Sequence, residues 1–150
     1  MRQRGFTLIE LMVALAVAVV LLSTALPSFF ESTARSRLQG AVNELSIDLQ
    51  YARSQAVRER AAVALTVASD GASYTITDAS STLKTVTLPR GVTLAANSTV
   101  SFDALRGLSA ATLFDATVSG VNGGLRVNTN LLGRVQLCSL STAFGGYPAC

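Results

Sequence analysis

The 150-residue sequence contains no histidine and no tryptophan, and it has only two cysteines and three prolines. Histidine is the commonest general base, zinc ligand and member of catalytic triads, so its absence argues against most hydrolase and metalloenzyme mechanisms. Charged residues are also sparse, at 14% of the chain, whereas about half of the residues are apolar. We therefore expect a single hydrophobic core, no enzyme activity, no cofactor and no bound metal.

A long apolar run lies close to the N-terminus. It extends from Phe6 to Leu26, every residue from Leu11 to Leu22 is apolar, and Pro27 ends it. As a helix, these 21 residues span roughly 31 Å, which is about the thickness of one hydrocarbon core. Arg2 and Arg4 precede the run and indicate that the N-terminus starts in the cytoplasm.

Glu10 distinguishes this run from two ordinary alternatives. A secretory signal peptide, cleaved near Ser23-Thr24-Ala25, has the same basic and apolar regions, and so does a plain membrane anchor. A carboxylate at the edge of an apolar run costs several kcal/mol unless it is paired, which makes it a functional residue by default. Neither alternative has a use for Glu10.

The segment Gly5-Phe6-Thr7-Leu8-Ile9-Glu10-Leu11 resembles the prepilin motif of type IV pilins and type II secretion pseudopilins. The resemblance implies that residues 1–5 are a leader, that a prepilin peptidase cuts between Gly5 and Phe6, and that Phe6 is then N-methylated. Glu10 is retained in the mature chain. Loss of the leader leaves ten basic and nine acidic residues, so the sequence pI of 9.3 says little about nucleic acid.

The resemblance also gives Glu10 a partner. After cleavage, Phe6 carries a free amine, and the amine of a neighbouring subunit can pair with the Glu10 carboxylate inside an otherwise apolar helix bundle. An unpaired buried charge is expensive, so this pair can set the register of assembly. We expect residues 6–27 to form a transmembrane and filament-core helix.

Beyond Pro27, apolar residues recur at three- and four-residue steps, which predicts an amphipathic helix continuing to about residue 60. This apolar stripe consists of Ala34, Leu38, Ala41, Val42, Leu45, Leu49, Ala52 and Ala56. The charged residues that fall mostly off it are Arg35, Arg37, Glu44, Asp48, Arg58 and Glu59. The segment from Asp48 to Val57 contains Ala52-Arg53-Ser54-Gln55-Ala56 and resembles the helix end of FimT/GspH-type pilins and pseudopilins.

Short β-branched or alternating runs fill the rest of the chain, with turn residues between them. They predict antiparallel strands in one or two small sheets, against which the apolar stripe packs. The fold class is therefore α+β, the pilin fold, with a globular domain over residues 28–150. The predicted strands are Ala62–Val67, Tyr74–Thr77, Leu83–Leu88, Val92–Ala95, Thr99–Phe102, Thr112–Phe114, Leu125–Val127 and Arg134–Leu137.

Cys138 and Cys150 are the only cysteines, and 11 residues separate them. An exported chain permits a disulfide, which on the loop-entropy model would stabilise the C-terminus by roughly 2–3 kcal/mol. A redox or metal site is the weaker alternative, because there is no Cys-x-x-Cys and no histidine. Many pilins close their C-terminal region with such a bridge, so the resemblance supports the disulfide.

Gly133-Arg134-Val135-Gln136 is similar to the Gly-Arg-x-Arg motif of FimT-type minor pilins that bind DNA, but Gln136 replaces the second arginine. A single arginine neutralises less phosphate. Arg126 and Arg106 add positive charge if the fold brings them near. The alternative is that Arg134 opens an edge strand and is simply solvated.

These observations predict a minor pilin that assembles into a type IV pilus and primes or caps the filament. The alternatives are a type II secretion pseudopilin of the H type and a pilus-associated DNA receptor for natural transformation. The expected partners are other pilins, which bind through the N-terminal helix, together with the prepilin peptidase and the inner membrane. DNA is a further partner if the chain is a DNA receptor. The expected location is a single-pass inner-membrane protein with a periplasmic head, and then the extracellular pilus.

Overall fold

The structure is a computed structural model that describes residues 7–95, 98–141, 144 and 146–150, without the side chains of residues 24–27. Gly5 and Phe6, the predicted processing site, lie outside the described residues. The chain divides into two compact units, Met1–Thr33 and Ala34–Cys150. The second unit is called the head below; it begins at Ala34, whereas the predicted globular domain begins at residue 28.

Helix α1 (Leu8–Glu59) starts in the first unit and ends in the head. Thr7 caps its N-terminus, because the Thr7 hydroxyl accepts a hydrogen bond from the Glu10 amide at 3.3 Å. The side chains from Leu8 to Ser23 are all exposed. By length and composition, α1 is apolar enough to cross a membrane, with a mean hydropathy of 2.5 over its most apolar stretch.

Within the head, α1 buries the predicted apolar stripe. The side chains of Leu38, Ala41, Val42, Leu45, Leu49, Ala52 and Ala56 are each no more than 5% exposed. The helix ends where Arg60 adopts a positive φ of 53°, and the Ala61 amide then donates to the Ala56 carbonyl at 3.2 Å. This is a Schellman ending with a non-glycine residue in the left-handed position.

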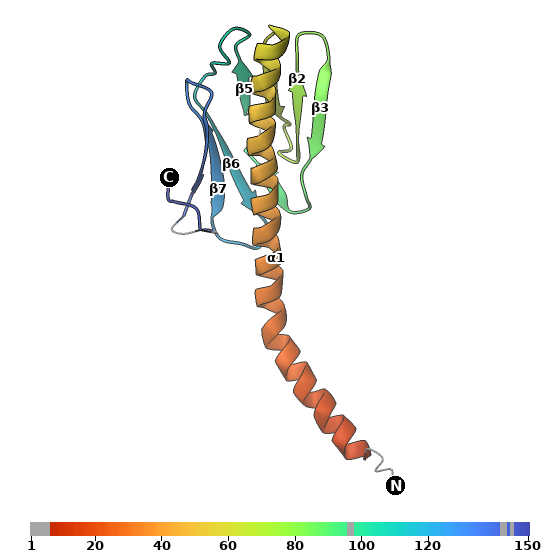
Figure 1. Cartoon of the computed structure of the whole chain (residues 1–150). Coiled ribbons are helices and arrows are strands. Elements are labelled where there is room, and N and C mark those ends of the chain that lie inside the picture. Colours follow the sequence, from red (N-terminus) through yellow and green to blue (C-terminus); the bar gives the residue numbers. More distant parts are fainter. Residues whose placement is uncertain (1–6, 96–97, 142–143, 145) are drawn as a thin grey trace, which may run out of the picture. The chain divides into compact units, whose positions relative to one another are not determined.

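In the described part of the chain, eight strands form two four-stranded antiparallel sheets, and the prediction had eight antiparallel strands. Figure 1 shows the head portion of α1 in front of them, with β2 and β3 on one side and β6 and β7 on the other. The first sheet, ordered β3-β2-β1-β5, contains β1 (Val63–Val67), β2 (Ser73–Thr77), β3 (Thr82–Thr87) and β5 (Thr99–Phe102). The second, ordered β4-β6-β7-β8, contains β4 (Val92–Leu94), β6 (Thr112–Val118), β7 (Gly124–Thr129) and β8 (Val135–Ser139).

One hydrophobic core joins the helix to both sheets, so the α+β pilin fold is confirmed. Strand β6 is longer than predicted, because Asp115 interrupts the apolar pattern in the sequence but faces outward in the strand. Phe114, Ala116 and Val118 on the opposite face are buried. Phe114 and Phe102 are among the largest fully buried side chains and fill the core from the second and first sheets respectively.

The placement of Asp48 off the buried stripe is wrong. Asp48 is 3% exposed, because residues from the first sheet reach across α1 to cover it. Its carboxylate accepts hydrogen bonds of 2.7 Å from the Tyr74 hydroxyl and from the Lys84 ammonium group. Burial and the nearby carboxylate raise the pKa of Tyr74, and the hydrogen bond to Asp48 raises the pKa of Lys84. Both partners therefore keep their protons, and the three side chains tie β2 and β3 to the helix.

The predicted disulfide is present between Cys138 and Cys150, whose Cα atoms are 5.0 Å apart. The bridge holds the C-terminal residues against β8. The Ser139 amide donates to the Pro148 carbonyl at 2.7 Å, and the Cys150 amide donates to the Ser139 carbonyl at 3.0 Å. The last residues of the described chain thus cover the end of β8 as a short parallel extension of the second sheet.

Candidate functional site

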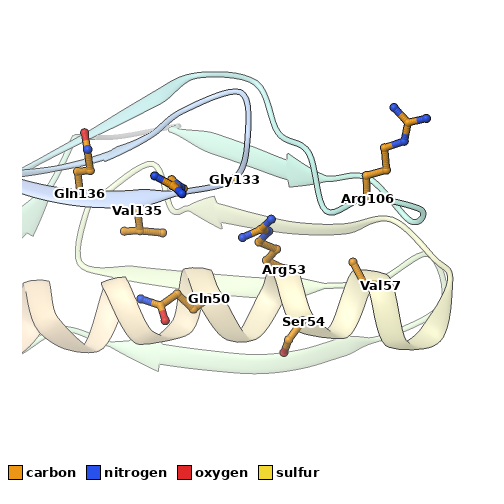
Figure 2. A pocket seen from close by; sticks show the side chains of 9 residues that line it. Gln50, Arg53, Ser54, Val57, Arg106, Gly133, Val135 and Gln136 are labelled. Carbon is orange, nitrogen blue, oxygen red and sulfur yellow. The ribbon is translucent and has the colours of Figure 1, made fainter.

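A groove of about 810 Å³ lies in the head between α1 and the start of β8 (Figure 2). We call it the basic groove. It is lined by Gln50, Arg53, Ser54 and Val57 of α1, by Arg106 of the β5–β6 loop, and by Gly133, Arg134, Val135 and Gln136. Three of the four predicted DNA-binding positions, Arg106, Arg134 and Gln136, therefore meet at one surface.

The turn between β7 and β8 fixes Arg134. The side-chain oxygen of Asn130 accepts hydrogen bonds from the amides of Leu132 and Arg134 at 3.0 and 2.9 Å, and its carbonyl accepts one from Gly133 at 2.9 Å. Gly133 has a φ of +69°, and a Cβ there would collide with the carbonyl oxygen of Gly107. The turn therefore needs glycine at 133, and it presents the exposed Arg134 at the mouth of the groove.

The loop between β5 and β6 is fixed in a similar way. The Asp103 carboxylate accepts hydrogen bonds of 3.1 Å from the amides of Leu105 and Arg106, and these bonds lower the pKa of Asp103. The loop backbone is therefore ordered next to the groove. In Figure 2 the guanidinium group of Arg106 points away from α1, so Arg106 contributes its charge at the rim.

Arg53 is a charged groove residue that the sequence did not point to as a site residue. Its Nε donates to the carbonyl of Gly107 at 3.1 Å, and its stem packs where a Cβ at Gly107 or Gly133 would stand. It joins α1 to both loops. In the sequence, Arg53 directly follows Ala52 at the border of the apolar stripe, which indicates that it lies beside the core. That position does not indicate which loops pack against its side chain.

Arg126 does not belong to the basic groove. It lies on β7 opposite Asp115 of β6, and the two side chains form a two-pronged ion pair in which Nη2 and Oδ2 are 2.8 Å apart. The guanidinium group lowers the pKa of Asp115. Because its charge is already matched, Arg126 adds little to anion binding.

The charge of the basic groove follows from the residues that line it. Its lining holds three arginines and, among the described residues, no carboxylate. Guanidinium groups favour carboxylates and phosphates, so the groove is suited to an anionic partner. In the described part of the chain, no group of histidine, cysteine, aspartate and glutamate is placed to hold a metal ion.

Comparisons with known proteins agree with this architecture. Residues 1–26 match the family described as a prokaryotic N-terminal methylation motif, and residues 41–141 match the family described as type II transport protein GspH. Two fimbrial proteins of Pseudomonas aeruginosa are each 42% identical to this chain over 57 residues. That match covers 38% of this chain and 36% of each relative, so it spans about a third of their length.

Two solved structures share the fold. The type IV minor pilin FimU of Pseudomonas aeruginosa is 29% identical, with a TM-score of 0.59 over 70% of this chain and 90% of that one. The minor pseudopilin EpsH from the type 2 secretion system of Vibrio cholerae is 12% identical, with a TM-score of 0.54 over 67% of this chain and 94% of that one. The likeness to EpsH is a likeness of fold alone.

Proposed function

Since the chain belongs to the GspH family of minor pilins and pseudopilins, we propose that it is a minor pilin that assembles into a type IV pilus and primes or caps the filament. The observation that carries the proposal is the apolar surface of the first unit. All described side chains from Leu8 to Ser23 are exposed, and such a surface is stable only in lipid or in a bundle of like helices.

The proposed sequence of events starts with the leader. The chain sits as a single-pass protein in the inner membrane with its head in the periplasm. The prepilin peptidase cuts between Gly5 and Phe6 and methylates Phe6, and the helix then docks among the helices of other pilins. Glu10 pairs with the Phe6 amine of a neighbour, and the head becomes part of the extracellular pilus.

A pseudopilin of a type II secretion system is the rival within the same family. The identity of 29% to a type IV minor pilin, against 12% to a pseudopilin, supports the pilus. The two systems also differ in where the assembled protein is found, because a pilus is shed into the medium by shearing.

Processing gives the direct test of the proposal. We expect the protein in sheared filaments to begin with an N-methylated Phe6, as measured by mass spectrometry of the intact chain. The mass should correspond to loss of residues 1–5 and gain of one methyl group. An N-terminus after Ala25, or absence of the protein from sheared filaments, would contradict it.

DNA binding is the second candidate function, and the gathering of Arg106 and Arg134 beside Arg53 favours it. Against it, Arg126 is paired with Asp115, and Gln136 stands where the motif has an arginine. Arg134 directly precedes β8, and Gln136 is the second residue of that strand. Residues two apart along an extended chain share a face, so an arginine at 136 would add a second cation next to the first.

Gel shifts at stated salt concentrations separate the outcomes. If the head binds DNA, Arg134→Ala should weaken binding equally across sequences and lower the salt slope by about one, because the contact is to phosphate. Gln136→Arg should strengthen binding. Arg90→Ala is the matched control, because Arg90 is exposed and is not part of the groove. If neither the wild type nor Gln136→Arg shifts the DNA band at low salt, DNA binding is ruled out as a function.

A further inference from the structure

The edge of β8 carries backbone groups that the sheet does not use. The Asn130 amide donates to the Arg134 carbonyl at 3.1 Å, which makes these two residues a hydrogen-bonded pair of the antiparallel β7–β8 ladder. Such pairs alternate along a ladder, so Val135, Leu137 and Ser139 direct their N–H and C=O groups away from β7. The outer edge of β8 is therefore open at every second residue.

The C-terminal residues of the chain cover only one of these three positions. Ser139 exchanges hydrogen bonds with Pro148 and Cys150, as the ladder predicts for an outward-facing residue. The next bond of that parallel ladder would run to the Leu137 carbonyl, and Pro148 has no N–H to donate. Among the described residues, none pairs with the outward groups of Val135 and Leu137. The edge is geometrically able to accept a strand and stays open over its first half.

The first residue of the open edge, Val135, lines the basic groove together with Arg134 and Gln136. In Figure 2, Val135 turns toward α1 and Gln136 turns away from it. A strand added here would alternate in the same way. One set of its side chains would face α1 and Arg53, and the other would lie beside Arg134 on the outer face. Arg53 uses Nε on Gly107, which leaves its terminal Nη groups to meet a carboxylate.

We infer that the open edge of β8 at Val135 and Leu137 accepts, by strand addition, an extended acidic segment of a neighbouring subunit in the filament. This inference rests on the proposed assembly function. The backbone ladder supplies the affinity, and the arginines select carboxylate side chains. The groove volume of about 810 Å³ suits a short peptide segment.

Two observations favour a protein segment over DNA. A phosphate backbone has no peptide groups to complete the ladder at Val135 and Leu137. In addition, Leu131 and Leu132 on the turn next to the groove are 68% and 58% exposed, and apolar side chains gain from contact with a protein and not from contact with phosphates.

Hydrogen exchange on the full-length protein tests the inference. The amides of Val135 and Leu137 should exchange at least about tenfold more slowly in sheared filaments than in the free, detergent-solubilised protein. The amide of Thr85, on the outer edge of β3, is the internal reference and should not slow. Equal exchange at Val135 and Leu137 in both samples would overturn the inference. If exchange at Val135 and Leu137 slows only when double-stranded DNA is added, and salt reverses the effect, the edge of β8 binds nucleic acid. The inference is then overturned as well.

Val135→Pro removes the outward donor at the first residue of β8, a position that tolerates proline. It should reduce the amount of the protein in filaments by about tenfold. Thr85→Pro, on the open edge of the first sheet, is the matched control and should assemble normally. Intact disulfide formation and an unchanged melting temperature show that each variant is folded.

Arg134→Glu gives a second variant that leaves the backbone unchanged. It should also deplete the protein from filaments, whereas Arg90→Glu should not. Normal assembly of both Val135→Pro and Arg134→Glu would refute strand addition while leaving the minor-pilin proposal in place. Absence of the wild type from filaments would refute the proposed function, and the inference would fall with it.

Discussion

Glu10→Ala should reduce the amount of the protein in sheared filaments at least about tenfold, while its processing stays normal. In the filament the carboxylate would lie among apolar helices, where an ion that loses its partner costs several kcal/mol. Each 1.4 kcal/mol is a factor of ten in an equilibrium constant, so the loss of one such pair is enough to exclude most copies. Quantitative mass spectrometry of sheared filaments and of membranes measures both quantities.

Controls separate this role from a local one. Glu10 stands three residues after Thr7, and its amide is bonded to the Thr7 hydroxyl, so it also occupies the position where an acidic side chain favours the start of a helix. Glu10→Gln keeps the size and a hydrogen-bonding group but removes the charge, and it should assemble as poorly as Glu10→Ala. Glu59→Ala, on the exposed last turn of the same helix, should assemble normally. Normal assembly of Glu10→Gln would contradict the pairing.

Asp48→Ala should destabilise the head by about 3 kcal/mol and lower its melting temperature by about 10 °C. The substitution leaves the buried Tyr74 hydroxyl without its acceptor and leaves the Lys84 ammonium group without its closest anion. It also weakens the link between β3 and α1, because the Glu44 carboxylate, which then remains opposite Lys84, lies farther away, at 3.6 Å instead of 2.7 Å. Thermal unfolding of the full-length protein, followed by near-ultraviolet circular dichroism, measures the change.

Glu44→Ala is the matched control for Asp48. Glu44 also faces Lys84, but at 3.6 Å and half exposed, so its loss should cost less than about 1 kcal/mol. Asp48→Ala combined with Lys84→Met should recover part of the stability, because the second change removes the cation that has lost its closest partner. Equal, small effects of Asp48→Ala and Glu44→Ala would show that the buried cluster contributes little.

The sequence predicted the elements well because their signals are local. The stripe from Leu38 to Ala56 repeats with the period of a helix, and the strands are marked by alternation and by turn residues between them. The N-terminal methylation motif could be recognised from a few adjacent residues. Such signals need only the residues of one segment. Strand β6 was predicted to end too early, because the outward-facing Asp115 interrupts the apolar pattern.

Features that depend on distant segments could not be predicted in the same way. Asp48 looked like a solvated charge because its partners, Tyr74 and Lys84, are 26 and 36 residues away. Arg53 lines the basic groove because the loops that carry Gly107 and Gly133 pack against it, and both loops are distant in the sequence. Arg126 had the right charge for the groove, but the strand register placed it opposite Asp115.

The order of the strands along the chain has a thermodynamic consequence. Strand β4 belongs to the second sheet, yet it precedes β5, which completes the first by pairing with β1. The chain therefore crosses between the sheets after β3, after β4 and again after β5. Neither sheet can be completed from a continuous stretch of sequence, because β4 and β5 are exchanged between the two sheets along the chain. Since one hydrophobic core also joins both sheets to α1, we expect the head to unfold as one cooperative unit, without an independently stable half.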